Sequence, residues 1–307
     1  MKTNTKILYL VLLGLAIIAP LVGVYPVFLM KAMCFALFAC AFNLLVGFTG
    51  LLSFGHAAFL GTGGYIAGYA IKSMGLPFEL SILAGTLVAA AIGFLVGSLA
   101  IRRQGIYFSM ITLALSQLIF FIYLQAPFTG GEDGIQGIPR GKLLGLIDLE
   151  NDLVFYYVVL TIFLFGFWLV YRTIHSPFGQ ILKSIRENEP RAISLGYDVD
   201  KYKLLAFVIS AGLAGMAGST KTIALHLASL TDVTWQASGE VVLMTLLGGL
   251  GTILGPVVGA IVVVTLQNYL ASYGSWVTVI MGVIFVLCVL AFRRGIVGEL
   301  RAAFNRS

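Results

Sequence analysis

The sequence carries very little charge for its length. Only 10% of its 307 residues are Asp, Glu, Lys or Arg, and 59% are hydrophobic, whereas soluble domains carry about 25% charged residues. A chain of this size cannot bury so much apolar surface in one core, so the remainder must face lipid. The composition therefore excludes a soluble protein and predicts an all-α polytopic membrane protein that forms one integral domain over residues 1–307.

Cysteine and histidine are also scarce, which excludes several kinds of site. The three cysteines lie inside apolar runs as small hydrophobic residues, and no pair has metal-ligand spacing. The three histidines are too scattered for a catalytic or metal-binding cluster. We therefore expect no catalytic residue, no metal and no cofactor. The scarce residues are Cys34, Cys40, Cys288, His56, His175 and His226.

A nucleotide-binding motif is missing too. The pattern GxxxxGK[ST] does not occur, and the one Gly-Lys pair, Gly141-Lys142, is followed by leucines. Any ATP-driven work must therefore come from a partner protein. The net charge of +6 fits anionic lipid head groups on the cytoplasmic face. Nucleic-acid binding is excluded because the basic residues are spread over short loops between apolar segments.

Long apolar segments are what the sequence has in abundance. A spanning helix needs about 20 mostly apolar residues, and eight segments qualify. The run 239–271 is too long for one helix, and the stretch GGLGTILGP (248–256) divides it, so we expect two short helices there. The first segment shows no small-x-small cleavage site and is expected to be an uncleaved span. The eight segments are Ile7–Val24, Phe28–Phe48, Gly55–Ile71, Phe78–Ile101, Ile106–Gln125, Leu153–Tyr171, Leu204–His226 and Ser275–Phe292.

Basic residues set the expected orientation, because cytoplasmic loops are enriched in Lys and Arg. With the N-terminus inside, the loop 172–203 is cytoplasmic and the acidic loop 126–152 is periplasmic. The arginines of the C-terminal tail also belong inside, which requires an even number of spans. We expect about ten spans, or eight if the two short helices form a re-entrant pair, with both termini cytoplasmic. The tail arginines are Arg293, Arg294, Arg301 and Arg306.

The cytoplasmic loop holds an unusual share of the charge. Nine of the 32 charged residues fall in the 28 residues 176–203. A solvated connector that follows the positive-inside rule accounts for the basic residues. It does not account for the mixed signs or for the regular placement of Pro and Gly. We therefore expect a rigid docking element for a partner protein.

Local signals divide this loop into segments. A short amphipathic helix is expected over 178–188. Pro190 disfavours helix at the residue before it and suits the first turn of a second short helix, 190–195. Gly196 is suited to the left-handed conformation that ends a helix. Asp198 or Asp200 is expected to cap the membrane helix that follows.

The segment SPFGQILKSIRENEPRAISLGYDVDKYKLLAFVISAGLAGMAG (176–218) resembles the cytoplasmic loop and next helix of LivM-type permease subunits of branched-chain amino acid ABC importers. The resemblance implies a type II-like importer permease in the bacterial inner membrane. It also implies a second permease subunit forming a hetero-dimer, two cytoplasmic ATP-binding subunits and a periplasmic solute-binding protein. Further motifs that carry it are NLLVGFTGLLSFGHAAFLGTGGY (43–65), TLALSQL (112–118), TGGEDGI (129–135) and FRRGIVG (292–298).

In that family the cytoplasmic loop is the element that couples to the ATPase. ABC permeases more widely carry an EAA-xxx-G pattern here. This sequence keeps Ala192 and Gly196 but has Pro190 and Arg191 where Glu and Ala would stand, so only the helix–Gly arrangement is carried over. The residues expected to couple are Arg186, Glu187, Glu189, Pro190, Arg191, Ala192 and Gly196.

Polar residues inside predicted spans mark the expected translocation pathway. Thr112 and Ser116 lie four residues apart on one helix face. The alternative role for these hydroxyl groups is hydrogen bonding within the bundle, and for His56 it is packing at a Gly-lined break. The pathway candidates are Asn43, Ser53, His56, Thr112, Ser116 and Gln117. The outer stretch TGGEDGIQGIPRG (129–141) is either a flexible connector or a contact surface for the binding protein.

We expect a permease subunit of an ATP-driven importer for branched-chain or other hydrophobic amino acids. The same mechanism with urea, short amides or another small polar solute as cargo is the alternative. A secondary transporter would need acidic residues in mid-membrane, and Glu240 lies only at the edge of a span. A membrane enzyme would need a catalytic cluster that the sequence does not contain.

Overall fold

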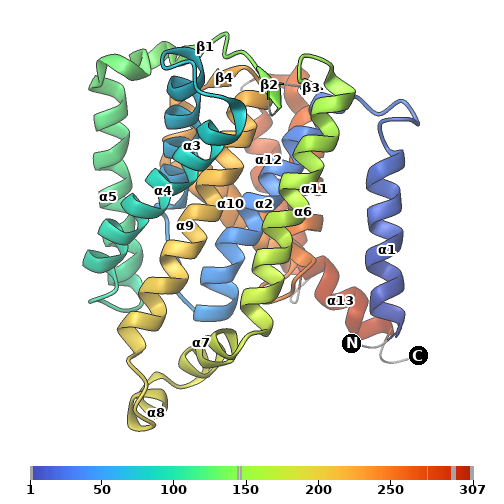
Figure 1. Ribbon diagram of the computed structural model, residues 1–307. Coiled ribbons are helices and arrows are strands. Elements are labelled where there is room, and N and C mark those ends of the chain that lie inside the picture. Colours follow the sequence, from blue (N-terminus) through green and yellow to red (C-terminus); the bar gives the residue numbers. More distant parts are fainter. Residues whose placement is uncertain (1–2, 144, 146, 275, 292–294, 305–307) are drawn as a thin grey trace.

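The apolar segments of the chain form helices, as they must where no water is present to satisfy the backbone. The computed structural model describes residues 3–143, 145, 147–274, 276–291 and 295–304 (Figure 1). The helices of the first half are α1 (Thr3–Ile18), α2 (Pro26–Thr49), α3 (His56–Lys72), α4 (Phe78–Ala100), α5 (Ile106–Gln125) and α6 (Asp152–His175). The second half contains α7 (Pro177–Glu187), α8 (Glu189–Ser194), α9 (Val199–Ala224), α10 (Trp235–Gly248), α11 (Gly255–Leu270), α12 (Trp276–Ala291) and α13 (Gly295–Phe304).

Each of the ten predicted membrane segments is confirmed as a helix, with shifted ends. The first helix ends at Ile18 and not at Val24, because the ring of Pro20 cannot continue a helix. The run 239–271 is divided as predicted, into α10 and α11. Ser275 and Phe292, the ends of the last predicted segment, lie outside the described residues.

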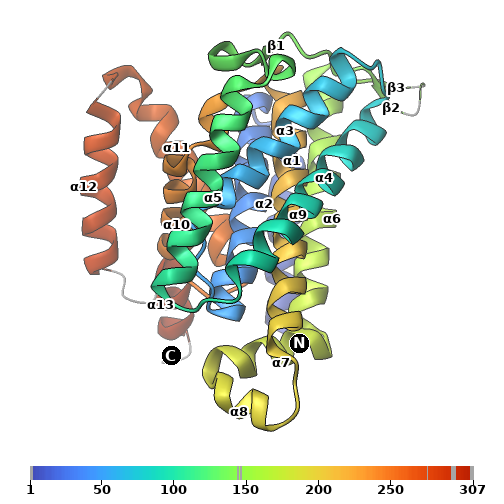
Figure 2. The same cartoon turned by 90° about the vertical axis from the view of Figure 1, so that its left-hand side faces the viewer.

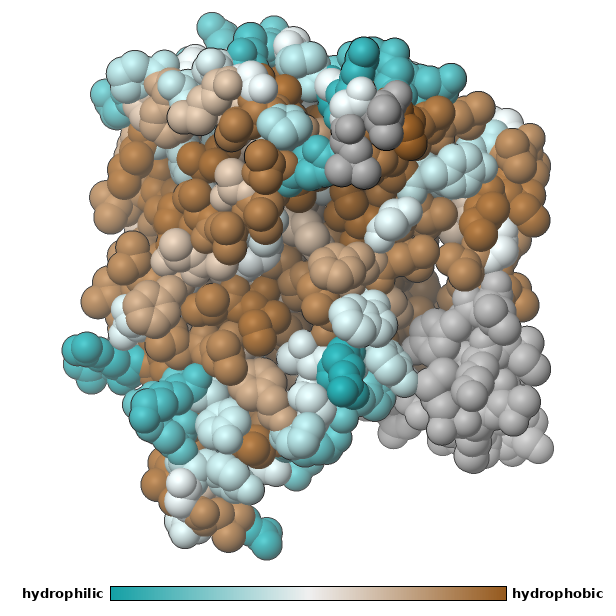
Figure 3. Space-filling model, viewed as in Figure 1, coloured by the Kyte–Doolittle hydropathy of each residue, from teal (hydrophilic) through white to brown (hydrophobic). Residues whose placement is uncertain are grey.

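Within the described residues, five helices are long and apolar enough to cross a membrane: α2, α4, α5, α6 and α9. α10 and α11 have 14 and 16 residues, fewer than an ordinary span requires. The count of about ten spans therefore stays a prediction, as does the re-entrant alternative. Figure 3 shows a broad hydrophobic band around the middle of one face, between hydrophilic residues at both ends.

α9 is the central helix and packs on α2, α3 and α4 (Figure 2). Small residues allow this close approach. A Cβ atom on Gly218 would collide with the carbonyl group of Leu60, and one on Gly63 would collide with the carbonyl group of Gly215. The α3–α9 contact is therefore made backbone to backbone.

The two ends of the bundle differ. The start of α1 and helix α13 lie at the end from which α7 and α8 project (Figure 1). The prediction that both termini and the charged loop lie on the cytoplasmic side of the membrane stays a prediction. Lys2 and the tail arginines Arg293, Arg294 and Arg306 lie outside the described residues.

The opposite end carries short strands and 3-10 turns. β1 (Ile135–Gln136) pairs antiparallel with β4 (Leu227–Ala228), with Ile135 opposite Ala228. β2 (Lys142–Leu143) pairs with β3 (Ile147–Asp148). The 3-10 turns at this end are η1 (Pro127–Thr129), η2 (Gly131–Asp133), η3 (Leu230–Val233) and η4 (Ala271–Tyr273). The outer loop is thus paired with the segment that follows α9.

Candidate coupling loop and polar sites

The charged loop contains the two short helices that the sequence predicts. Ser176 caps α7, with its Oγ accepting a hydrogen bond from the Gly179 amide at 3.3 Å. Asn188 lies between the two helices and has an extended backbone conformation (φ −157°). It caps α8, because its side-chain Oδ1 accepts a hydrogen bond from the Arg191 amide at 3.1 Å. The break therefore falls at Asn188, one residue earlier than predicted, because Glu189 already belongs to α8 and Pro190 occupies its first turn.

The end of the loop is also as predicted. Gly196 has a φ of +86°, the left-handed conformation that favours glycine. Asp198 caps α9, accepting a hydrogen bond from the Lys201 amide at 3.3 Å. The hydrogen bond from the Lys201 side chain holds the pKa of Asp198 below its ordinary value. α9 starts at Val199, five residues before the predicted Leu204, because Asp198 caps the helix at the residue before Val199.

Three of the predicted coupling residues bind the loop to the bundle. The Glu189 carboxylate accepts from Lys203 Nζ at 2.6 Å and from Gln104 Nε2 at 2.8 Å, and the Lys203 side chain is only 3% exposed. Ala192 is buried in a small cluster that contains apolar residues of α7 and of α9. The Arg186 guanidinium donates to the carbonyl of Gly47 at the end of α2. These contacts tie the loop to α9, to the α4–α5 connection and to α2.

The other four predicted residues, Glu187, Pro190, Arg191 and Gly196, are exposed. They surround an apolar tip that the sequence did not single out: Ile193 is 57% exposed and Leu195 is 68% exposed. α8 projects from the end of the bundle, with hydrophobic side chains at its tip (Figures 1 and 3). The loop therefore has an inner face that anchors it and an outer face that is free to contact a partner.

Three of the predicted pathway residues come together at the 50–55 break between α2 and α3. Thr112 Oγ1 accepts from the Phe54 amide at 3.3 Å, and Ser53 Oγ accepts from the Gly55 amide at 3.3 Å. Ser116 lies beside Gly55: a Cβ atom added to Gly55 would be 3.4 Å from the Cβ atom of Ser116. The polar face of α5 therefore supports a non-helical segment within the bundle.

Asn43 and His56 lie apart from that group. Asn43 Nδ2 donates to the Thr252 carbonyl at 2.8 Å, and its Oδ1 accepts from the Gly251 amide at 3.0 Å. It thus holds the Gly-rich break between α10 and α11. His56 is fully buried, with Nε2 2.7 Å from Ser210 Oγ. Four phenylalanine rings surround it: Phe38, Phe42, Phe59 and Phe207.

Two predicted pathway residues, Gln117 and His56, have a buried side-chain nitrogen without a hydrogen-bond partner among the described residues. In Gln117 this atom is Nε2. A buried side-chain amide without a hydrogen-bond partner is costly.

Buried charged residues are the main feature that the sequence did not reveal. Lys203 pairs with Glu189, and Lys221 of α9 pairs with Asp232 of η3, with side chains 10% and 14% exposed. At the outer end Arg140 is 3% exposed and pairs with Asp152 at 2.7 Å. Among the described residues, no group of three His, Cys, Asp or Glu side chains is placed to hold a metal ion.

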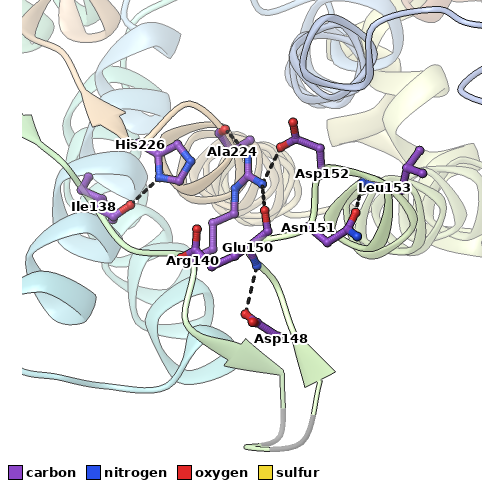
Figure 4. A network of polar contacts seen from close by, with 9 residues as sticks. All are labelled: Ile138, Arg140, Asp148, Glu150, Asn151, Asp152, Leu153, Ala224 and His226. Carbon is purple, nitrogen blue, oxygen red and sulfur yellow. Dashed lines mark hydrogen bonds and ion pairs between the residues drawn. The ribbon is translucent and has the colours of Figure 1, made fainter.

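Arg140 ties the outer loop to two helices (Figure 4). Its guanidinium donates to the Asp152 carboxylate at the start of α6 and, at 3.3 Å, to the Ala224 carbonyl at the end of α9. It also lies over the Phe155 ring, 4.7 Å from the centroid. His226 Nδ1 lies 2.8 Å from the Ile138 carbonyl oxygen. The outer loop is therefore anchored and is not a free connector.

These features define a class: a helical, multi-pass membrane protein with an anchored loop projecting from one end. The chain belongs to the family described as the branched-chain amino acid transport system permease component, whose model matches residues 24–290. Members of this family are permease components of transport systems, and five helices of the described residues are long and apolar enough to cross a membrane.

Three curated relatives illustrate the range of the family. The branched-chain amino acid permease LivM of Escherichia coli is 27% identical over 281 residues, covering 84% of this chain and 66% of the relative. The probable LivM of Methanocaldococcus jannaschii is 26% identical over 212 residues, covering 66% and 60%. The ribose import permease RbsC of Bacillus subtilis is 28% identical over 197 residues, covering 61% and 58%. The chain thus spans 66% or less of the length of these relatives. No solved structure matches the chain.

Proposed function

We propose that this chain is the membrane-spanning subunit of an ATP-driven importer for branched-chain or other hydrophobic amino acids. In this proposal residues 172–203 couple it to a separate cytoplasmic ATPase. The anchoring of the loop carries the proposal: a buried Glu189–Lys203 ion pair fixes a projecting helix whose tip exposes Ile193 and Leu195. Two exposed apolar side chains on a charged cytoplasmic tip are suited to a pocket on a partner protein.

Anchoring makes the loop able to transmit force. A partner that moves the α8 tip would move α9 through Glu189–Lys203 and α2 through Arg186 and the Gly47 carbonyl. The nucleotide state of the ATPase then biases two arrangements of the permease, as coupling between sites requires.

The remaining partners follow from the same proposal. The importer would contain a second permease subunit, two ATP-binding subunits and a periplasmic solute-binding protein. The outer loop 126–152 is the proposed contact for the binding protein, and the anchoring of Arg140 between α6 and α9 supports it. The proposed pathway passes the 50–55 break and Gln117, where a non-helical backbone and an unsatisfied amide lie within the bundle.

The cargo has two candidates. The names of the LivM relatives support a branched-chain amino acid. The ribose import permease of B. subtilis and an autoinducer 2 import permease of Salmonella choleraesuis, 25% identical over 244 residues, support a small polar solute as the second candidate.

Reconstitution of the complete importer in liposomes tests the proposal, with ATP-driven uptake of L-leucine and D-ribose as the measurement. Ile193→Ser and Leu195→Ser are each expected to abolish uptake and to weaken co-purification of the ATPase subunits. Gln180→Ala, at an exposed position of α7, is the control and should behave like the wild type. Normal uptake by both tip variants, or uptake by the permease without any ATPase, would contradict the coupling role.

A further inference from the structure

The break between α10 and α11 is held in place by a side chain of α2. Residues 249–254 are not helical, and Gly249 and Gly251 have φ angles of +117° and +73°, which favour glycine. Asn43 accepts a hydrogen bond from the Gly251 amide at 3.0 Å and donates one to the Thr252 carbonyl at 2.8 Å. Asn43 is only 2% exposed. A buried amide of another helix therefore satisfies two backbone groups of the break.

Arg186 of α7 reaches the same place from the coupling loop. Its guanidinium donates to the Gly47 carbonyl, and its Nη1 atom would be 3.3 Å from a Cβ atom added to Gly251. A Cβ atom added to Gly47 would be 2.7 Å from the Gly251 amide nitrogen, so the end of α2 and the break are in direct backbone contact. α7 itself lies beside the end of α2 (Figure 1). The coupling loop, α2 and the break therefore meet at one point.

A cavity of about 430 Å³ lies beside this contact. Within the described residues, none of its three charged side chains forms a salt bridge. A polar cavity of this size has room for water, and non-helical backbone at membrane depth is tolerated where it lines a water-filled cavity. The break can therefore shift without leaving its backbone groups unsatisfied. The lining residues are Gly47, Phe48, Lys183, Arg186, Glu187 and Gly251.

The coupling loop is attached to the bundle by two contacts of different kinds. Glu189 and Lys203 form an ion pair in which the lysine is buried, and this pair fixes the loop to α9. Arg186 is exposed and donates to a neutral carbonyl group. Loss of the Arg186 contact should therefore leave the loop docked, and it should separate the loop only from α2 and from the break.

We propose that the break 249–254 is the cytoplasmic gate of the permease, and that Arg186 and Asn43 are positioning residues that connect it to the ATPase. When the ATPase displaces α7, Arg186 moves the end of α2 through the Gly47 carbonyl, and Asn43 moves the break together with α2. The cavity provides the space for this movement. The inference rests on the proposed function and identifies the segment that responds to the ATPase.

Hydrogen–deuterium exchange of residues 248–255 in the assembled importer measures the state of the break, because the Gly251 amide exchanges only when its bond to Asn43 opens. In the wild type, exchange of this segment should differ between the nucleotide-free importer and the importer with a non-hydrolysable ATP analogue. Arg186→Gln should abolish this difference. Asn43→Ala should make the segment exchange faster in both states.

Transport assays in liposomes separate a gate from a structural contact. Uptake is measured for L-leucine and for D-ribose. Arg186→Gln should lower the uptake of whichever solute the wild type transports by about tenfold or more. Its ATP hydrolysis and the exchange of residues 189–203 should stay at the wild-type level, so that hydrolysis is uncoupled from transport. Arg186→Lys keeps a charged donor and should restore part of the uptake and part of the nucleotide response.

Lys183→Gln is the matched control. Lys183 lies on the same helix and lines the same cavity, but its Nζ lies 5.8 Å from the centroid of the Phe48 ring, so it should keep both the uptake and the nucleotide response of the wild type. Loss of ATP hydrolysis or of ATPase co-purification in Arg186→Gln would place Arg186 at the ATPase interface and overturn its role at the gate. Identical exchange of 248–255 in both nucleotide states of the wild type would also overturn the gate. A wild-type importer that takes up neither solute would instead overturn the proposed function.

Discussion

Breaking the Glu189–Lys203 pair should release the coupling loop, and the two partners should not be equivalent. Lys203 is 3% exposed and Glu189 is 21% exposed. Glu189→Gln therefore leaves a buried ammonium group unpaired, which costs about 3–5 kcal/mol. Lys203→Met leaves a carboxylate that reaches water and keeps its hydrogen bond from Gln104, so its cost should be about 1 kcal/mol.

These free-energy costs destabilise the docked state of the loop on the bundle, so they increase the fraction of molecules in which the loop is undocked. Since each 1.4 kcal/mol is a factor of ten, about 3 kcal/mol raises the undocked fraction of Glu189→Gln roughly 100-fold. The double variant Glu189→Gln/Lys203→Met carries no buried charge. It should therefore resemble Lys203→Met, with a coupling free energy of about 3 kcal/mol between the two sites.

Hydrogen–deuterium exchange of residues 177–198 in the assembled importer measures this opening directly. ATP-driven uptake should fall in the same order as loop protection. Lys201→Met is the matched control, because its ion pair with Asp198 is exposed to solvent, with side chains 82% and 51% accessible, and exposed ion pairs contribute little to stability. Equal effects of Glu189→Gln and Lys203→Met, adding in the double variant, would refute the reasoning.

Three further substitutions test the loop, the core and the pathway. Gly196→Val forces a β-branched residue into a left-handed conformation (φ +86°) at a cost of about 1–2 kcal/mol, so exchange of the loop should rise and uptake should fall while membrane insertion stays normal. Gly218→Val puts a Cβ atom onto the Leu60 carbonyl and should lower the thermal unfolding temperature of the detergent-solubilised protein, whereas Gly282→Ala, with open space around it, should not. Gln117→Leu removes the unsatisfied amide; it should lower leucine uptake without loss of assembly, and unchanged flux would remove α5 from the pathway.

The parts of the fold that depend on residues adjacent in the sequence could be predicted from the sequence. Pro190 and Gly196 act through their own backbone geometry, so the two short helices and their end follow from local rules. The same holds for the division of 239–271 at its glycines, and for the apolar segments as a whole. The differences between the predicted and observed ends of the helices have local causes as well, such as Pro20 just after the end of α1.

The functions of individual side chains could not be predicted in this way, because they depend on contacts between distant segments. Glu189 and Arg186 were expected to face a partner, and they are bonded to Lys203 and to the Gly47 carbonyl. The apolar tip was missed because Ile193 and Leu195 look like ordinary core residues in a sequence. Only the position of α8 outside the bundle shows that they are exposed.

α9 connects the two ends of the molecule on which the proposed mechanism depends. Its 26 residues extend about 39 Å at 1.5 Å per residue. At the loop end Lys203 is held by Glu189, and at the outer end Lys221 is held by Asp232 while the Ala224 carbonyl accepts from Arg140. Breaking a buried ion pair is strongly destabilising. Movement of the cytoplasmic loop or of the outer loop is therefore opposed unless α9 moves with it. Docking of a binding protein outside and of an ATPase inside would then act on the same helix, and linkage requires that each changes the affinity for the other by the same factor.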